Sequence, residues 1–330
     1  MSATDVEHMD RALARGKGPA HARFFACVRH SSPMNAPLVA TGYALVTVLI
    51  TAVQNITIRL AADEGAHAFQ VVLFRNAFGL LSVMAIILWT ERALPRSRHA
   101  RPIAFACVAH VVSMMCGYYG IAVLPLNESA ALAFAMPLFA TVGAALFLGE
   151  TVRARRWSAV AAGFAGVLII LRPGVIPFEP GAGMVLLSAM LGAAITLMFK
   201  RFVAREQAMT LIFYQSLFAM LLSAPPAALV WEAPTGFAAS MMIVNGLLGT
   251  LGWITFLRAC MLADASALMP FEFLRLPVIA VFAYLLFGEV PDRWVWLGAA
   301  VIFSSTLYIA HREAAVGRAA AARRKHDEGA

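Results

Sequence analysis

Three charged side chains lie inside stretches of sequence that are otherwise apolar. Arg75 is near the middle of one such stretch, and Glu272 and Arg275 are near the middle of another. A charge at the centre of a bilayer costs ~3 kcal/mol on insertion scales, so a retained charge normally faces a cavity or a partner. Arg75 has no acidic residue within a turn of its own helix. We therefore expect its partner to come from another helix or from a substrate.

The planar guanidinium of Arg75 suits a carboxylate or a ring carbonyl of a substrate. The alternative is that it clamps helices together through carbonyl groups or through Glu272. Glu272 and Arg275 are three residues apart, which places them on one helical face with Cβ atoms about 5 to 6 Å apart. They form either a structural ion pair or a group that binds substrate or couples transport to protons.

Uncharged polar residues mark further faces of the predicted helices. Gln54 and Asn55 continue a polar arc of about 100° that begins at Thr47. Tyr118 lies toward the outer end of another apolar stretch that also carries His110. We expect Gln54, Asn55 and Tyr118 to line a substrate path, although amide side chains can instead join helices as polar contacts.

Prolines interrupt two of the apolar stretches. Pro137 lies in one, and Pro270 and Pro277 lie in the other. A proline removes a backbone donor and tends to kink its helix, and in a membrane the freed carbonyl groups must find partners in protein or water. Interruptions at corresponding places in two halves of a transporter point to the binding site. We expect these three prolines to lie near it.

No motif in the sequence indicates an enzyme, a metal site or a bound cofactor. The sequence contains no GxxxxGK[ST], HExxH or GxSxG pattern, and its four cysteines, which we expect to be reduced packing residues, show no CxxC spacing. Lys and Arg are scattered among short connections rather than gathered on one face, which disfavours nucleic-acid binding. We expect a small-molecule substrate, no cofactor and no metal.

The elements that position these residues are predicted to be transmembrane helices. Of the 330 residues, 61% are hydrophobic and 13% are charged, against about 25% charged in soluble proteins. The apolar stretches have the length of bilayer-spanning helices, about 20 residues each. We place ten of them: 37–60, 66–90, 102–124, 129–148, 155–171, 181–200, 208–231, 237–258, 265–287 and 293–311.

The basic residues predict the orientation of these spans. Twenty-one of the 26 Lys and Arg residues lie in the tails, in the connections or at the span ends on one side of the predicted membrane, and only Arg59, Arg172 and Arg293 lie on the other side. Positive residues favour the cytoplasmic side. We therefore expect a multi-pass protein of the cytoplasmic (inner) membrane with cytoplasmic tails at 1–36 and 312–330.

An internal repeat determines the predicted architecture. Pro125–Glu150 resembles Leu262–Glu289, and both segments end in Gly-Glu after an aliphatic run. Because each half has five spans, an odd number, the second copy must enter the membrane from the opposite side. The sequence thus predicts an all-α integral membrane protein of ten transmembrane helices, arranged as two inverted five-helix repeats at 37–171 and 181–311. Such repeats are typical of secondary transporters.

Several blocks, taken in order, resemble a known family. They are FRNAFGLL (Phe74–Leu81), the first repeat block followed by RRWSAVAAGFAGVLIILRPG, and PFEFLRLPVIAVFAYLLFGEVPDRWVWLGA (Pro270–Ala299). Together they resemble EamA-type members of the drug/metabolite transporter superfamily, in a ten-helix branch that includes carriers of riboflavin and of S-adenosylmethionine. The resemblance implies a structural role near helix ends for Gly149, Glu150, Gly288 and Glu289.

The predicted function is secondary transport of a small organic metabolite by alternating access, with riboflavin-like and S-adenosylmethionine-like compounds as candidates. An exporter of amino acids or related metabolites is an alternative within transport. A membrane receptor or assembly subunit that binds a ligand without moving it is an alternative of another class. A homodimer is possible in each case.

Overall fold

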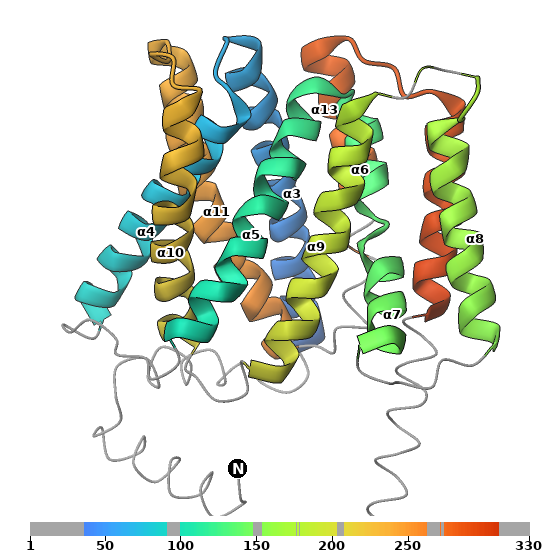
Figure 1. The fold of residues 1–330 in the computed structure, drawn as a ribbon, viewed down its shortest axis with the longest axis horizontal. Helices are drawn as coiled ribbons and strands as arrows, with labels where there is room; N and C mark the ends of the chain where they lie inside the picture. Colours follow the sequence, from blue (N-terminus) through green and yellow to red (C-terminus); the bar gives the residue numbers. More distant parts are fainter. Residues whose placement is uncertain are drawn as a thin grey trace, which may run out of the picture.

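The computed structural model describes residues 36–90, 100–147, 154–175, 177, 179–202, 208–262, 271 and 274–309. Its regular elements are helices that run side by side in one bundle (Figure 1). The first half contains α3 (Ala36–Asp63), α4 (Ala68–Thr90), α5 (Ala100–Val123), α6 (Leu126–Ala133), α7 (Met136–Phe147) and α8 (Ala154–Leu171). The second half contains α9 (Pro180–Phe202), α10 (Ala208–Leu229), α11 (Gly236–Leu262), α13 (Arg275–Phe287) and a last helix, Arg293–Ile309.

The helices have the length and composition of membrane spans. Within the described residues, five stretches are long and apolar enough to cross a bilayer: Val39–Asp63, Ala68–Trp89, Ala106–Val123, Leu126–Leu146 and Gly236–Phe256. Leu81, Leu88 and Leu285 are among the large apolar side chains that face outward from the bundle. An outer surface of this kind is stable in lipid rather than in water. The chain is therefore an all-α, multi-pass membrane protein.

The two halves run in opposite directions. In Figure 1, α3 rises from the lower end of the bundle, whereas α9 descends from the upper end. The start of α3 and the end of the last helix, where the described bundle begins and ends, both lie at the lower end. This is the inverted arrangement that the internal repeat predicts.

One predicted span is divided into two helices. α6 ends at Ala133 and α7 begins at Met136, so Pro137 is the second residue of the new helix, where its missing N–H has no intrahelical role. Pro277 has a similar place in the first turn of α13. Pro270 and Glu272 lie outside the described residues, as do Gly149 and Glu150.

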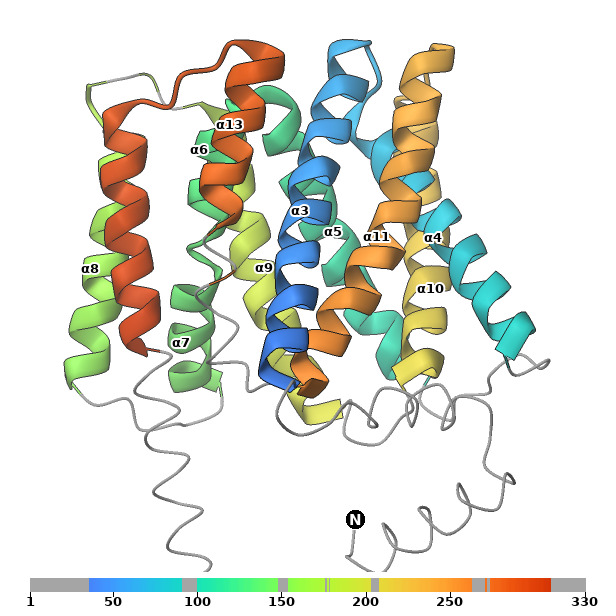
Figure 2. The same cartoon turned by 180° about the vertical axis from the view of Figure 1, so that it is seen from behind.

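Glycines allow several helices to approach closely. α3 packs along α11, as the view from behind shows (Figure 2). A Cβ atom added to Gly246 of α11 would lie 2.7 Å from the Phe78 Cβ of α4. One added to Gly117 of α5 would lie 2.8 Å from the Ser188 Oγ of α9. Small residues at such contacts are the usual means of helix association in lipid.

Candidate functional site

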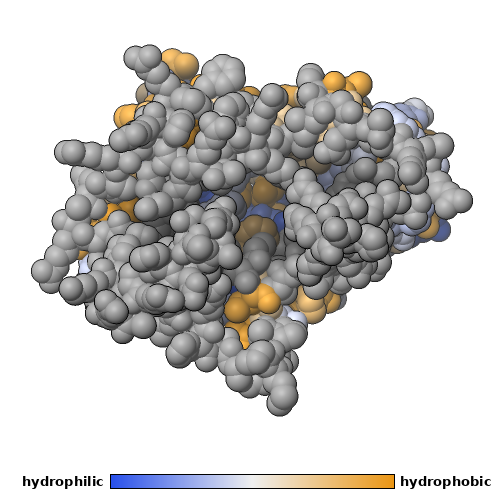
Figure 3. Space-filling view, turned by 90° about the horizontal axis from the view of Figure 1, so that it is seen from below, coloured by the Kyte–Doolittle hydropathy of each residue, from blue (hydrophilic) through white to orange (hydrophobic). Residues whose placement is uncertain are grey.

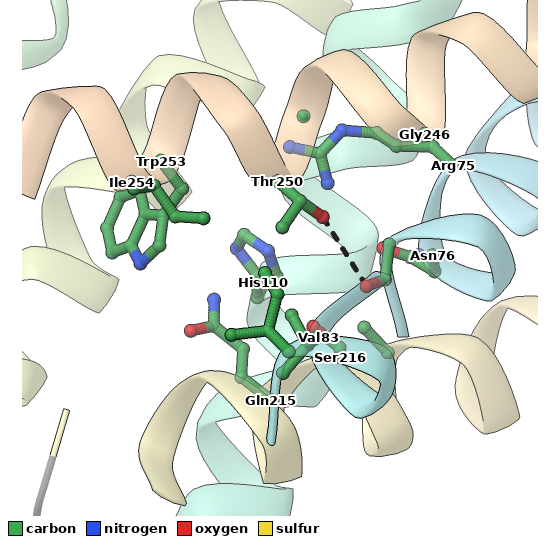
Figure 4. Close-up of a pocket in the computed structure, with 14 residues that line it drawn as sticks. Arg75, Asn76, Val83, His110, Gln215, Ser216, Gly246, Thr250, Trp253 and Ile254 are labelled. Carbon is green, nitrogen blue, oxygen red and sulfur yellow. Dashed lines mark hydrogen bonds between the residues drawn. The ribbon is translucent and has the colours of Figure 1, made fainter. Parts of the chain in front are cut away.

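A cavity of about 150 Å³ lies between α4, α5, α10 and α11. Its polar wall consists of Arg75 and Asn76 from α4, His110 from α5, Gln215 and Ser216 from α10, and Thr250 from α11. Trp253 and Ile254 add apolar surface. Figure 4 shows these side chains converging from the four helices. Figure 3 views the molecule from the end that carries Ala36 and Ile309, and a hollow is visible near its centre.

Arg75 reaches the cavity from α4 and contacts mostly neutral groups. Its Nη1 donates to the Met114 Sδ at 3.8 Å, and its Nε has no hydrogen-bond partner. The guanidinium also interacts electrostatically with His110 and with the hydroxyl of Tyr118. Of the described residues that line the cavity, Arg75 alone carries a formal charge. The wall is thus positively charged, with neutral donors and acceptors around it.

Gly249 of α11 makes room for Arg75. A Cβ atom at this position would lie 3.3 Å from the Arg75 Nε and also 3.3 Å from the Gln54 Nε2. Arg75 and Gln54 therefore meet over the same turn of α11, although they come from α4 and α3. Asn55, the next residue after Gln54, is half-buried and is not among the residues that line this cavity.

Asn245 connects three of the helices around the cavity. Its side chain is fully buried, and its Nδ2 donates to the Gln54 carbonyl oxygen at 3.0 Å and to the Thr57 Oγ1 at 2.8 Å. The Tyr118 hydroxyl donates to the Asn245 Oδ1 at 3.1 Å, and the Gln54 Nε2 donates to the Asn245 carbonyl oxygen at 3.4 Å. These bonds join α3, α5 and α11. Tyr118 and Gln54 thus belong to a hydrogen-bond network between helices beside the cavity.

Several residues in or beside the cavity were not identified from the sequence. Gln215 and Trp253 line the cavity, and Asn245 lies beside it; each is a single polar or amphipathic residue in a nearly uniform apolar helix. The only signal in the sequence was the free-energy cost of burying a polar side chain in the membrane, because a buried amide needs hydrogen-bond partners in the protein. That cost fits Asn245, whose amide bonds to neighbouring helices on both sides.

Arg275 lies at a different place from Arg75. Its guanidinium carbon is 4.7 Å from the centre of the Phe134 ring, next to the break between α6 and α7. This distance is typical of a cation–π contact. Arg275 does not line the cavity between α4, α5, α10 and α11. The structure therefore separates two charges that the sequence assigned to one binding site.

A second polar cluster lies at the upper end of the bundle in Figure 1, where α3 ends. Arg59 of α3 donates from Nη1 to the carbonyl oxygens of Ala122 and Leu124, each at 3.0 Å, and its Nε lies 3.2 Å from the Asp63 carboxylate. The Glu289 carboxylate accepts the Leu126 N–H at 2.9 Å and lies 4.0 Å from the Arg59 Nη2. We call this cluster the Arg59 corner. It fixes the end of α5 and the start of α6 to the segment after α13.

The described residues contain no group of His, Cys, Asp and Glu side chains with the geometry of a metal site. The described lining of the cavity offers one guanidinium, several amide and hydroxyl groups, and apolar surface, which suit reversible recognition of a small molecule.

Comparisons with known proteins agree with this architecture. The model of the EamA-like transporter family matches residues 39–172 and 179–310. An S-adenosylmethionine uptake transporter of Rickettsia bellii is 29% identical over 251 residues, which are 75% of this chain and 85% of that protein. A riboflavin transporter of Rhizobium johnstonii is 31% identical over 277 residues, which are 84% of this chain and 90% of that protein.

A solved crystal structure shares the fold. It has a TM-score of 0.57 and 16% sequence identity, and the match covers 85% of this chain and 99% of the solved one. The two family matches leave only short segments of the bundle unmatched, and each falls on one half of the inverted pair. The chain therefore belongs to the EamA-like transporter family.

Proposed function

We propose that this protein is a secondary transporter that moves a small organic metabolite across the cytoplasmic membrane by alternating access. The cavity between α4, α5, α10 and α11 is its substrate site. The observation that carries the proposal is a polar, positively charged cavity inside a bundle whose outer surface is apolar. Residues 37–171 and 181–311 are the two repeats that move against each other.

The names of the relatives give the first substrates to test. Four relatives from Rickettsia species are named S-adenosylmethionine uptake transporters, and three from other bacteria are named riboflavin transporters. Both compounds carry a planar ring and several hydrogen-bond acceptors. These features suit a wall that combines a guanidinium, amides and an indole.

Flux into sealed vesicles tests the proposal. Purified protein is reconstituted, and uptake of radiolabelled S-adenosylmethionine, riboflavin and a set of amino acids is measured against protein-free vesicles. We expect saturable uptake of at least one compound. Saturable binding without any flux would instead support a receptor or an assembly subunit.

The basic residues support an orientation with both tails in the cytoplasm. The end of the bundle that carries Ala36 and Ile309 faces the cytoplasm, and the Arg59 corner faces outward. Single cysteines at positions 150 and 289 test this. We expect a membrane-impermeant maleimide to label position 289 from outside intact cells and position 150 only after the cells are opened. Labelling of both from the same side would contradict the inverted topology.

Glu272 and Arg275 are proposed to couple transport to protons. If they form only a structural pair, removal of one charge leaves the other buried and costly, and the double variant Glu272→Gln/Arg275→Gln restores expression and activity. If Glu272 accepts a proton, the double variant inserts normally but loses proton-driven accumulation, while exchange persists. Near-normal accumulation by the double variant would exclude the coupling role.

A further inference from the structure

The charge on Arg75 is not balanced by any described group of the cavity. The described partners of its guanidinium are a thioether sulfur, a phenol and an imidazole. By contrast, the Arg172 Nη2 lies 2.6 Å from the Asp292 carboxylate, and Arg59 contacts Asp63 and Glu289. Among the described residues, the fold thus supplies anions to Arg59 and Arg172 but only neutral groups to Arg75.

An unpaired cation in a poorly hydrated site is costly. The penalty for removing an ion from water is several kcal/mol in real proteins unless a counter-charge or strong hydrogen bonds compensate. A thioether is only a weak acceptor, so Met114 does little to offset that penalty. An anion that enters the cavity can therefore form an ion pair with Arg75 that no described side chain forms. The planar guanidinium can donate two parallel hydrogen bonds to the two oxygens of a carboxylate.

The volume limits what can lie beside Arg75. A cavity of about 150 Å³ is about the size of the engineered protein cavity that holds one benzene molecule. In the structure as described, only one compact end of a larger metabolite can occupy it. Asn76, Gln215 and Thr250 surround that end with neutral polar groups. Their oxygen atoms can accept hydrogen bonds from an ammonium group on the same end.

We infer that the cavity recognises its substrate through a carboxylate held by Arg75, so that the transported compounds are carboxylic acids or zwitterions, and the same compounds with the carboxylate esterified or amidated are rejected. This inference rests on the proposed function and names the substrate class of the same site. Of the two compounds named for the relatives, S-adenosylmethionine has a carboxylate and riboflavin has none. The inference therefore favours the former type of substrate for this chain.

Thermal stabilisation of the purified protein tests the inference without relying on transport. The probes are S-adenosylmethionine and its carboxyl methyl ester, phenylalanine and its primary amide, and riboflavin. A hydrogen bond between charged groups contributes about 1.5 to 3 kcal/mol, so we expect at least one acid to bind about 10- to 100-fold more tightly than the matching ester or amide, which lacks the carboxylate charge. We expect Arg75→Gln to abolish this preference.

Two further variants complete the test. Arg293→Gln makes the same chemical change at an exposed arginine that lies over Trp294 at the other end of the bundle, and it should keep the full preference for acids. Arg75→Lys keeps the charge but not the fork, so it should retain a weaker preference. If Arg75→Gln does not fold, the inference is tested by comparing how strongly each acid and its ester or amide stabilise the wild-type protein and Arg75→Lys.

Three results would overturn the inference. They are equal stabilisation by the acids and by their esters or amides, an acid preference that survives in Arg75→Gln, and failure of every acid to stabilise the wild-type protein, whether or not riboflavin stabilises it. Absence of flux in vesicles, with acid-specific binding intact, would instead reject the proposed transport function and leave the carboxylate site in place.

Discussion

Arg59 and Arg75 show how one side chain serves two purposes in the same membrane protein. Arg59 binds two backbone carbonyl groups and lies beside two carboxylates. Arg75 has a sulfur at 3.8 Å as the acceptor of its Nη1, and no carboxylate is among the described residues that line its cavity. An arginine with several partners in the protein, such as Arg59, has a structural role, whereas an arginine with few partners, such as Arg75, is available to bind a ligand.

The Arg59 corner uses its polar groups on the protein itself. The carbonyl groups at the end of a helix and the N–H groups at the start of the next have no intrahelical partners. Arg59 satisfies the carbonyl groups after α5, and Glu289 satisfies the first N–H of α6. These bonds are made within the protein, so we expect the corner to have a structural role.

The largest effect is expected from Arg75→Ala. We expect transport to fall by at least about 100-fold, because the charge that holds the substrate is lost, while the protein is still inserted in the membrane. Initial uptake rates, normalised to the amount of protein in the membrane, measure this. Arg293→Ala is the matched control and should transport normally. Substantial uptake by Arg75→Ala would reduce Arg75 to a packing residue like Arg59.

Arg59→Gln should have a smaller effect, mainly on stability. The change leaves the Ala122 and Leu124 carbonyl groups short of a donor and removes a partner from two carboxylates, at a cost of about 1 to 3 kcal/mol in the free energy of unfolding. Denaturation in detergent, compared with wild type and Arg293→Gln, measures the loss. The preference for acids over esters should not change. A changed preference would show that the corner also shapes the substrate site.

Gly249→Ala should weaken substrate binding without loss of stability. The new methyl group would lie 3.3 Å from both the Arg75 Nε and the Gln54 Nε2, so both side chains must shift by a few tenths of an ångström. We expect KM to rise by roughly three- to tenfold, while the higher helix propensity of Ala offsets the steric cost. Gly42→Ala, which meets nothing within 4 Å, is the control. An unchanged KM would place the substrate away from this turn of α11.

The smallest effect is expected from Glu289→Gln. The amide oxygen can still accept the Leu126 N–H, so the change removes only the charge at the start of α6 and a long contact to Arg59. We expect a loss of about 1 kcal/mol or less in unfolding free energy. A strong loss of transport at normal stability would show that the corner takes part in the transport cycle.

The sequence predicted the fold better than it predicted the cavity. Span positions, the break near Pro137 and the inverted halves follow from hydrophobic length, proline chemistry and an odd number of spans per repeat. Arg75 was identified because a charged side chain in the membrane is costly and is normally retained only where it faces a cavity or a partner. Gln54 and Asn55 were treated alike, yet neighbours on a helix differ by 100° in direction, and only Gln54 reaches Gly249.

The remaining cavity residues depend on packing that no local pattern records. α10 and α11 are apolar on nearly every face, so their sequences do not show that Gln215 and Trp253 turn toward α4. Arg275 was paired with Glu272 by spacing alone. Its contact with Phe134 arises because α13 of one half packs against α6 of the other, and such a pairing between halves is fixed only by the assembled bundle.

The unbalanced charge of the cavity also has a kinetic consequence. In the proposed alternating-access cycle, the empty carrier closes over a bare guanidinium, whereas the carrier loaded with a carboxylate closes over a neutral pair. An unpaired ion is more costly to seal from water, so we expect the return of the empty carrier to limit the cycle. We expect labelled substrate to enter vesicles preloaded with unlabelled substrate roughly tenfold faster than empty vesicles, for a difference of about 1.4 kcal/mol in barrier height. Equal uptake rates into preloaded and empty vesicles would show that the charge of Arg75 does not determine the rate-limiting step. A carrier of this kind equilibrates two existing pools more readily than it fills an empty compartment.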